Sequence, residues 1–442
     1  MRGSDICAAI INRVRESIHS ESFRQQYRVG NRFTRIRKLS MGMVMAFLLF
    51  VRKRSLPNEI SEFLSLYQEQ ISEIIGKTVS CFTKQAISKA RKGISLDAFY
   101  WLLDTSVSIW MQLSAQRDTW NGLHVFAIDG TDVQLPMRKQ CASVFGTQKV
   151  RGDGAFPMAK GSMLYSVTSH LVADALLDRC KYSEREMAMQ HMDRFRKLKL
   201  AEKSVILMDR GYFSKELCEM MHNSNVYYVF RLRKNLNLLH DFRVSKKRSV
   251  ILDLNKDTDS QAQLPVRVLR FKLSTGEYEY LLTNLVDPSF TISMLKELYS
   301  LRWSIEGKYR QMKSRFQLEN FSGYSEEAID QDFLISVFYA NLVEILRSEA
   351  DDRIRQQLNA DNCRCKREYA PNTGVLVGSL KRYLPSVLLG LCDAAYAAKE
   401  IICCASQRSN WSQLMPGRHY SRQVKHPASK FCYGSLLAQC CS

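Results

Sequence analysis

Two short apolar runs that each lead directly into an aspartate constrain the fold of this chain more than any other feature. The first run, His124–Ile128, leads into Asp129, and the second, Ser204–Met208, leads into Asp209. Runs of this length predict buried β-strands. A carboxylate at the end of such a strand is costly unless a partner compensates its charge. We therefore expect a sheet that brings both carboxylates to one edge, where they serve a function.

The elements expected around these runs predict a mixed α/β fold. Strand patterns at 161–172 and 173–180 and a helical pattern at 183–198 separate the two runs, and a helical pattern at 214–222 follows the second. Strand patterns then recur at 227–232, 266–271 and 278–283, before a long helical pattern at 292–315. We divide the chain into a helical basic region 1–118, a first core part 119–225, a β-rich segment 226–290, a second core part 291–348 and a helical basic region 349–442.

The charge balance predicts a polyanionic partner. The chain carries 64 Lys and Arg against 44 Asp and Glu, a net charge of +20, which suits nucleic acid or an anionic membrane surface. The longest apolar run, 41–51, is about half of the ~20 residues that a bilayer requires, and the N-terminus lacks a signal-peptide pattern. We therefore expect an intracellular protein with no membrane partner. The basic residues concentrate in the first hundred residues, along 299–313 and in the tail after Glu400, which carries no acid.

One short basic segment resembles the recognition helix of a helix-turn-helix. The segment 83–92 follows an amphipathic helical pattern at 56–75 and ends at Gly93. A helix of this kind can lie in the major groove of DNA, and the alternative is a solvated basic face. The candidate DNA contacts in it are Lys84, Lys89, Arg91 and Lys92.

A third acid, Glu306, lies inside the long helical pattern. At about 100° per residue, Tyr299, Arg302, Glu306 and Lys313 fall on one face of a continuous helix. Three clustered carboxylates repel one another unless a cation lies between them, and their hard oxygens suit Mg²⁺ or Mn²⁺. Two such ions form a clamp for phosphoryl transfer. The alternatives are an ordinary solvated pair between Arg302 and Glu306, and Asp132 as the first ligand.

Together these residues resemble a known family. The pattern Tyr-x2-Arg-x3-Glu-x6-Lys at 299–313 is similar to the signature of the DDE transposases of the insertion-sequence-four group. Asp129-Gly-Thr and Asp209-Arg-Gly-Tyr resemble the two aspartate boxes of that family and come in the same order. Ser183-Glu-Arg and Pro416-Gly-Arg also lie where similar proteins have them. The resemblance covers about residues 30–425, and it implies an RNase H-like core interrupted by a β-rich insertion.

The resemblance also implies a bacterial cytoplasmic, nucleoid-associated location, an activity and a site. Asp129, Asp209 and Glu306 would bind two Mg²⁺ (or Mn²⁺) ions, and the enzyme would cut DNA at the element ends and join the 3′-hydroxyl to target DNA. The partners would be double-stranded DNA, namely the terminal inverted repeats and the target, and a second copy of the chain in a synaptic homodimer. The residues that would contact DNA phosphates are Tyr299, Arg302 and Lys313, with Arg210 pairing a carboxylate or a phosphate beside Asp209.

Two other functions fit the same residues. One is a catalytically silent or domesticated DNA-binding protein of this fold, and the other is an RNase H-like nuclease without strand transfer. Some members of the family pass through a DNA hairpin with the help of an aromatic residue of the insertion, and Tyr278 or Tyr280 could serve here.

Several neighbouring residues have a structural interpretation. We expect Trp303 to pack in the core, and Asp174 to be a loop or strand-edge acid. His191 shows no ligand spacing and is interpreted as structural. Glu184 either supports the site or is an ordinary acid at the start of a helix.

Overall fold

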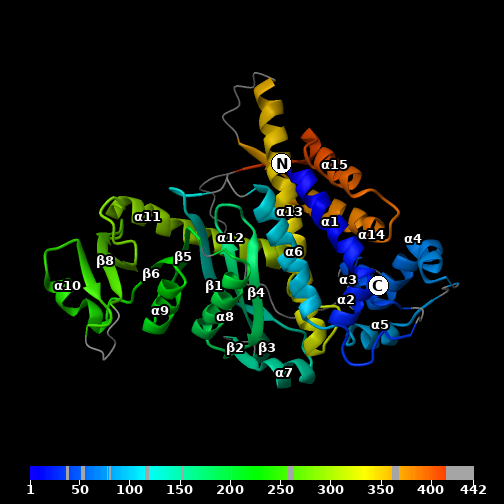
Figure 1. The fold of residues 1–442 in the computed structure, drawn as a ribbon, viewed down its shortest axis with the longest axis horizontal. Coiled ribbons are helices and arrows are strands. Elements are labelled where there is room, and N and C mark those ends of the chain that lie inside the picture. The colour runs from blue at the N-terminus through cyan, green and yellow to red at the C-terminus, as the bar shows by residue number, and fades with distance from the viewer. Residues whose placement is uncertain are drawn as a thin grey trace, which may run out of the picture. The chain divides into compact units, whose positions relative to one another are not determined.

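The structure is a computed structural model that folds into two compact units (Figure 1). It describes residues 1–35, 39–50, 55–76, 78, 81–114, 119–150, 154–200, 202–256, 263–360 and 368–414. The helical unit comprises Met1–Ser114, Val133–Met158 and Gln311–Ser442, and the sheet unit comprises Ala115–Asp132 and Ala159–Arg310. The part of the predicted basic tail after Leu414, which includes the Pro416-Gly-Arg motif, lies outside the described residues.

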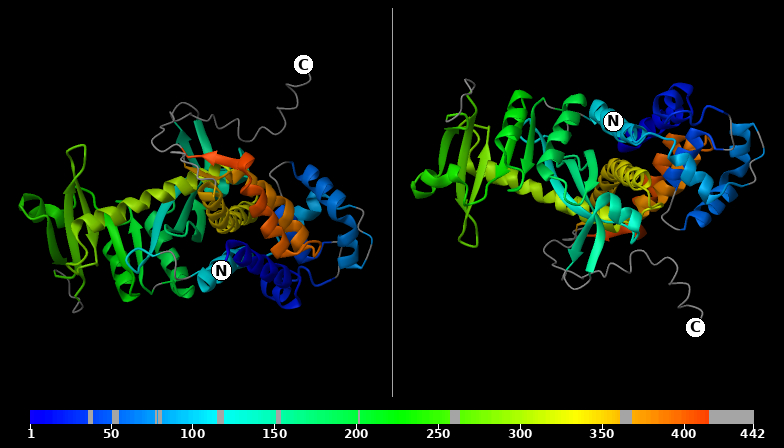
Figure 2. Two further views of the ribbon diagram at one scale, coloured as in Figure 1. Left: turned by 90° about the horizontal axis from the view of Figure 1, so that it is seen from above. Right: turned by 90° about the horizontal axis from the view of Figure 1, so that it is seen from below.

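The long helix α13 (Glu326–Ala360) forms the centre of the helical unit. Nearly every residue from 328 to 346 is buried, because this stretch is apolar on all sides and is surrounded by other helices. Figure 2 looks along α13 and shows its neighbours beside it. The helices that pack against it include α1 (Gly3–Ile18), α6 (Asp97–Ser114), α14 (Thr373–Leu388) and α15 (Ala394–Ala405).

The basic N-terminal region is helical, as predicted. It contains α2 (Glu21–Tyr27), α3 (Met41–Phe50), α4 (Leu56–Ile75) and α5 (Lys84–Arg91). All residues of α3 are buried in the unit, and no helix within the described ranges has the length and apolarity needed to span a bilayer. The hydroxyl of Thr83 accepts a hydrogen bond from the Ala86 amide and caps α5. The connection 76–83 is longer than the ~3–4-residue turn of a helix-turn-helix.

The sheet unit is built on a mixed sheet, which confirms the predicted α/β class. Its strands follow the order β4-β3-β1-β5-β6, consistent with an RNase H-like core, and β1, β5 and β6 run parallel to one another. Helices α8 (Glu184–Lys197) and α9 (Lys215–Asn223) contact this sheet through β4 and β6 respectively. The strands are β1 (His124–Gln134), β3 (Gly154–Ser166), β4 (Val172–Arg179), β5 (Ser204–Met208) and β6 (Tyr227–Arg231).

The strands of the predicted β-rich insertion continue the same sheet. Strand β9 (Tyr278–Thr283) pairs antiparallel with β6, β8 (Pro265–Lys272) pairs with β9, and β7 (Ser249–Asp253) pairs with β8. The first strand of the predicted insertion, β6, pairs with the core strand β5. Since β6 is shared in this way, the insertion is an extension of the core sheet rather than a separate layer. The short helix α10 (His240–Val244) precedes β7.

Short elements complete the two units. Helix α7 (Lys139–Phe145) and strand β2 (Thr147–Val150) belong to the helical unit, where β2 pairs with the first residues of β3. Strands β10 (Tyr369–Pro371) and β11 (Trp411–Gln413) form a two-stranded sheet.

Two expected elements differ from the structure, one at the Asp129-Gly-Thr motif and one at the motif 299–313. Strand β1 continues beyond Ile128 to Gln134, so Asp129 lies within the strand rather than at its end. The expected helix 292–315 is interrupted: α11 (Ile292–Ser300) and α12 (Ser304–Ser314) are joined by a 3₁₀ turn, Leu301–Trp303. A single helical wheel therefore does not describe the four motif residues, because a 3₁₀ turn rotates about 120° per residue.

Candidate active site

The parallel pairing of β1 with β5 brings two of the predicted carboxylates together. Ile128 pairs in register with Met208, and Asp129 and Asp209 are the next residues on the two strands. Adjacent strands lie about 4.8 Å apart, and residues at equivalent positions point to the same face. The two carboxylates therefore follow directly after paired residues of two adjacent strands, which places them close together.

Arg302 links the third predicted carboxylate to the first. Its Nη1 lies 3.4 Å from Asp129 Oδ2, and its Nη2 lies 3.3 Å from Glu306 Oε1. The guanidinium is 2% exposed, and its Nε has no hydrogen-bond partner among the described residues. Both contacts are long for charge-assisted hydrogen bonds, so Arg302 neutralises the two acids without being tightly held by them.

A tyrosine and a second arginine contact Asp209. The Tyr299 hydroxyl lies 3.4 Å from Asp209 Oδ1, and burial raises the pKa of Tyr299, so the hydroxyl stays a donor. Arg231, on β6, lies 3.8 Å from the same oxygen and pairs with Glu279 at 2.7 Å. We did not predict Arg231 from the sequence, because its contact with Asp209 depends on the pairing of β6 with β5.

Burial perturbs the first carboxylate strongly. Desolvation raises the pKa of Asp129 to about 6, although Arg302 and the Gly130 amide oppose the shift. The neighbouring charges of Asp209 and Glu184 raise this pKa further. Arg302 and the Gly130 amide thus offset the desolvation of this carboxylate only in part, and additional positive charge beside it would be favourable.

Two glycines make room for Glu184 between the aspartate boxes. A Cβ atom at Gly130 would lie 2.7 Å from Glu184 Oε1, and one at Gly211 would lie 3.6 Å from Oε2. Lys160 Nζ lies 3.4 Å from Glu184 Oε1 and 2.7 Å from Asp132 Oδ1. Glu184 is thus both an acid in the first turn of α8 and a neighbour of the two aspartates, so both predicted interpretations apply.

The donor set has the chemistry of a divalent-cation site. All three predicted ligands supply carboxylate oxygens, the donor type that Mg²⁺ and Mn²⁺ prefer. Within the described stretches, however, no three His, Cys, Asp or Glu side chains are arranged to hold an ion as they stand. The donors fit a divalent cation, while Arg302 supplies the positive charge between Asp129 and Glu306 in this arrangement.

The other predicted DNA contacts near the site occupy different environments. Tyr299 and Arg302 are buried beside the carboxylates, whereas Arg210 is exposed. Lys313, in the part of α12 that belongs to the helical unit, lies 3.5 Å from Glu319. Trp303 is 55% exposed, and the Arg302 guanidinium lies 4.7 Å from its ring centre. The expectation that Trp303 packs in the core is therefore wrong, because the 3₁₀ turn directs it outward.

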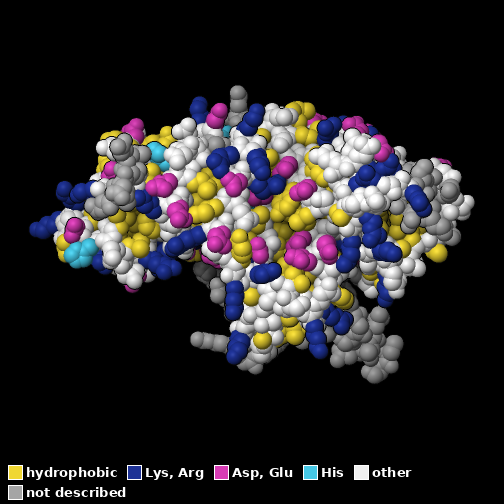
Figure 3. Space-filling view, turned by 60° about the horizontal axis from the view of Figure 1, so that its bottom comes forward, with side chains coloured by type: hydrophobic (Ala, Val, Ile, Leu, Met, Phe, Trp, Pro, Cys, Tyr) yellow, Lys and Arg dark blue, Asp and Glu magenta, His cyan; other side chains and the backbone are white. Residues whose placement is uncertain are grey.

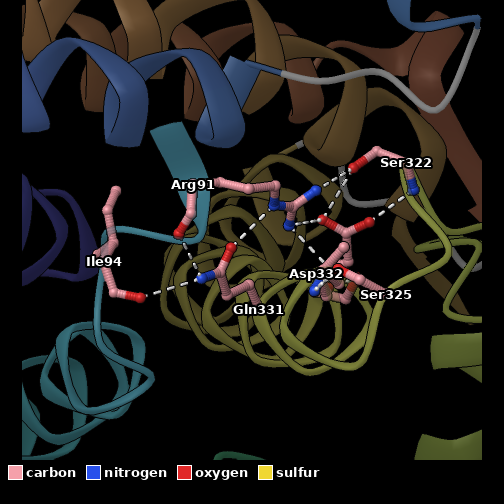
Figure 4. Close-up of polar contacts among 8 residues, drawn as sticks. Arg91, Ile94, Ser322, Ser325, Gln331 and Asp332 are labelled. Carbon is pink, nitrogen blue, oxygen red and sulfur yellow. Dashed lines mark hydrogen bonds and ion pairs between the residues drawn. The ribbon is translucent and has the colours of Figure 1, made fainter. Parts of the chain in front are cut away.

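The prediction that Arg91 contacts DNA is wrong for this fold (Figure 4). Its side chain is buried, and the guanidinium donates to Gln331, Ser322, the Ala328 carbonyl and Asp332. A guanidinium whose donors are used inside the unit cannot reach a phosphate. The three other basic residues predicted in this segment, Lys84, Lys89 and Lys92, are exposed.

Two further predictions have definite outcomes. Asp174 lies within β4 and is fully buried, so the loop interpretation is wrong; it pairs with His191 Nδ1 at 2.7 Å and with Arg194 at 2.7 Å. Of the two tyrosines considered for base stacking, Tyr278 is 47% exposed and Tyr280 is buried.

On the face seen in Figure 3, Lys and Arg side chains occur widely, with Asp and Glu side chains among them towards the middle. On this face the charge surplus by itself does not single out one path for a nucleic acid.

Comparison with known proteins identifies the class to which this fold and site belong. Residues 120–342, half of the chain, match the family described as the transposase DDE domain, and the chain belongs to this family. The match includes Asp129, Asp209 and Glu306. Members of this family use divalent metal ions.

Two curated relatives come from Escherichia coli strain K12. The transposase InsG of insertion sequence element IS4 is 26% identical over 271 residues, which cover 58% of this chain and 60% of InsG. The putative transposase InsZ is 21% identical over 199 residues, which cover 42% of this chain and 65% of InsZ. The chain thus spans less than two thirds of the length of either relative.

The chain is also similar to solved structures, among which is a transposase complex. The cryo-electron-microscopy structure of a piggyBac transposase synaptic complex with hairpin DNA has a TM-score of 0.43 and 11% identity. The match covers 94% of this chain and 87% of that one.

Proposed function

We propose that this protein is a DNA transposase that cuts DNA at the ends of its element and joins the freed 3′-hydroxyl to a target. The observation that carries the proposal is the neighbouring placement of Asp129 and Asp209 on adjacent parallel strands, with Arg302 between Asp129 and Glu306. A convergence of hard oxygen donors in a transposase-family core fits metal-dependent phosphoryl transfer. The reaction would take place on bacterial DNA in the cytoplasm.

Asp129, Asp209 and Glu306 are the groups that would hold two Mg²⁺ or Mn²⁺ ions. Bound there, such ions would activate an attacking oxygen and stabilise the leaving oxygen of a phosphodiester. The protein's own residues prepare this site: Tyr299 orients Asp209 by a hydrogen bond, and Arg302 offsets the negative charge of Asp129 and Glu306. Arg302 is also suited to contact a phosphate, because its long contacts to the two acids cost little to exchange.

The residues that would contact DNA include Lys313 and three exposed lysines in the helical unit and, in the sheet unit, Arg210. Lys84 and Lys89 lie on α5, and Lys92 is the C-cap residue that follows it. Each phosphate contact releases counterions and steepens the salt dependence of binding by about one charge. Double-stranded DNA with the terminal inverted repeats, target DNA and a second copy of the chain would be the partners.

A cleavage and joining assay tests the proposal directly. Linear DNA ending in the element's own inverted repeats is incubated with the protein, Mg²⁺ and a supercoiled target plasmid. We expect cutting at the repeat ends and joined products with the unaltered protein. Asp209→Ala should lose both and keep DNA binding. Asp193→Ala, which removes a half-exposed acid of α8, is the matched control and should cut and join normally.

The outcomes separate the proposal from its rivals. A protein that binds the repeats without cutting would be a silent DNA-binding protein, and one that cuts without joining would be a nuclease. Full activity of Asp209→Ala would show that the ligand assignment is wrong.

A salt titration tests the surface on α5. Lys89→Ala should weaken binding to the repeats and lower the slope of log affinity against log salt by about one phosphate contact. Lys399→Ala, an exposed lysine of α15, is the control and should leave the slope unchanged. An unchanged slope in Lys89→Ala would remove α5 from the interface.

A further inference from the structure

A buried tyrosine joins the helix of Glu306 to the backbone of Asp129. Tyr309 lies on α12, three residues after Glu306, and is 6% exposed. Its hydroxyl donates a 2.6 Å hydrogen bond to the Asp129 main-chain carbonyl. This bond is at the short end of the range for O–H···O hydrogen bonds. It is much shorter than either contact of Arg302, at 3.3 and 3.4 Å.

The same carbonyl is also contacted by a second buried hydroxyl. Ser162, on β3, lies 3.4 Å from the Asp129 carbonyl oxygen, and its hydroxyl contacts His191 Nε2 at 2.9 Å. His191 in turn contacts the buried carboxylate of Asp174 at 2.7 Å. The backbone at Asp129 is therefore contacted both by α12 and by a buried polar chain that includes side chains of β3, α8 and β4.

We infer that Tyr309 is a positioning residue that sets the separation of Asp129 and Glu306. This inference rests on the proposed function, in which the two carboxylates share metal ions. Arg302 is the only other described residue seen to link these two acids, and it does so through long contacts to side chains that can rotate. The hydrogen bond from Tyr309 instead holds the main-chain carbonyl of Asp129. The position of the Asp129 carboxylate depends on the position of that main chain.

The chemistry of metal binding makes such a link consequential. The groups of a catalytic or metal-binding site must stay within about 0.5 Å of the arrangement in which they work. Residues that are not themselves ligands are needed to hold them there. Loss of a partner of this kind commonly costs about 10–100-fold in metal affinity or activity. Without the Tyr309 hydroxyl, the Asp129 main-chain carbonyl would lose its short hydrogen bond to α12.

The test compares Tyr309→Phe with a matched control elsewhere in the chain. Tyr339→Phe removes the same kind of bond, a buried tyrosine hydroxyl that donates to the main-chain carbonyl of Leu49 within the helical unit. Both variants keep their rings and lose one buried hydroxyl. Two quantities are measured: the Mg²⁺ concentration that gives half-maximal cleavage of repeat-ended DNA, and the affinity for Mn²⁺ alone by calorimetry without DNA.

We expect Tyr309→Phe to need about tenfold more Mg²⁺ and to bind Mn²⁺ about tenfold more weakly, with metal-free DNA binding unchanged. Tyr339→Phe should match the unaltered protein in both measurements. Equal metal dependence in Tyr309→Phe and the unaltered protein would overturn the inference, and so would equal losses in the two variants, which would indicate general destabilisation. If Tyr309→Phe does not fold, Ser162→Ala tests the same carbonyl and should also raise the Mg²⁺ requirement.

The two measurements separate this inference from the proposed function. If the unaltered protein binds Mn²⁺ but does not cut DNA, the proposed function fails and the inference is judged on Mn²⁺ affinity. If it neither binds Mn²⁺ nor cuts, both are overturned.

Discussion

Replacing Arg91 by methionine should unfold the helical unit at markedly lower denaturant concentration while leaving its DNA contacts intact. Methionine keeps most of the length of the side chain and removes the guanidinium. The guanidinium makes hydrogen bonds of 2.8 Å to Gln331 Oε1, 2.8 Å to Ser322 Oγ and 2.9 Å to Asp332 Oδ1, and one of 3.1 Å to the Ala328 carbonyl. All of these are lost together.

The magnitude follows from what remains behind. Asp332 is 5% exposed, and after the substitution it keeps its bonds to the amide and hydroxyl of Ser322 but loses its ion pair with Arg91. Removing one member of a buried ion pair typically costs ~3–5 kcal/mol, because the other charge stays buried without compensation. A domain is stable by only ~5–15 kcal/mol, so the loss would be a large fraction of the total.

The assay is urea denaturation, with the adjacent basic residue as a control. Lys92 pairs with Glu327 at 3.8 Å, and both side chains are half exposed. Exposed pairs of this kind contribute below ~1 kcal/mol, so Lys92→Met should barely change stability. In a DNA titration we expect the opposite pattern. Lys92→Met should lower the slope of log affinity against log salt, and Arg91→Met should leave that slope unchanged.

A double substitution tests the reasoning most strictly. Arg91→Met combined with Asp332→Asn should cost less than the sum of the two single changes, since neither charge is then left alone. The reasoning is refuted if Arg91→Met is as stable as Lys92→Met, or if it lowers the salt slope at unchanged stability. The second result would restore Arg91 as a DNA contact.

Two further predictions concern the carboxylate site. Because burial raises the pKa of Asp129 from 3.8 to about 6, the folded protein should lose up to about 3 kcal/mol as pH rises from 4 to 7. Metal-free Asp129→Asn should therefore be more stable than the unaltered protein at pH 8 but not at pH 4 in urea titrations; equal stability at both would contradict the shift. Gly130→Ala should slow cleavage, because its Cβ would lie 2.7 Å from Glu184 Oε1 and would displace that carboxylate. Gly211→Ala should be tolerated, because its Cβ would lie 3.6 Å from Glu184 Oε2. Equal cleavage rates of the two variants would contradict the packing argument.

Local patterns were sufficient to predict most elements of the fold. The run Ser204–Met208 forms β5 with the same bounds, because its four consecutive apolar residues, Val205–Met208, are a pattern typical of a buried strand. The pattern at 56–75 forms α4 with the same bounds. The short strand β7 was not predicted, since its alternation becomes visible only through its pairing with β8.

The environment of individual side chains was much less predictable. Arg91 and Lys92 are neighbours in a basic segment, yet only Arg91 turns inward, and its partner Asp332 lies far away in the sequence. Trp303 and Arg302 exchange the environments expected of an aromatic and a charged residue. Helical periodicity could not predict either case, because burial of a charged side chain depends on which distant groups meet it.

The sequence by itself determined which residues are available for chemistry, and tertiary structure decided how they meet. The apolar runs before Asp129 and Asp209 encode two strands, and the motif 299–313 encodes helical structure carrying Glu306. The parallel register of β1 and β5, the bridge by Arg302 and the tie from Tyr309 to Asp129 join segments that are far apart in the chain. Such contacts arise from the packing of whole elements, whose energy is shared by many distant residues and leaves no local pattern to detect.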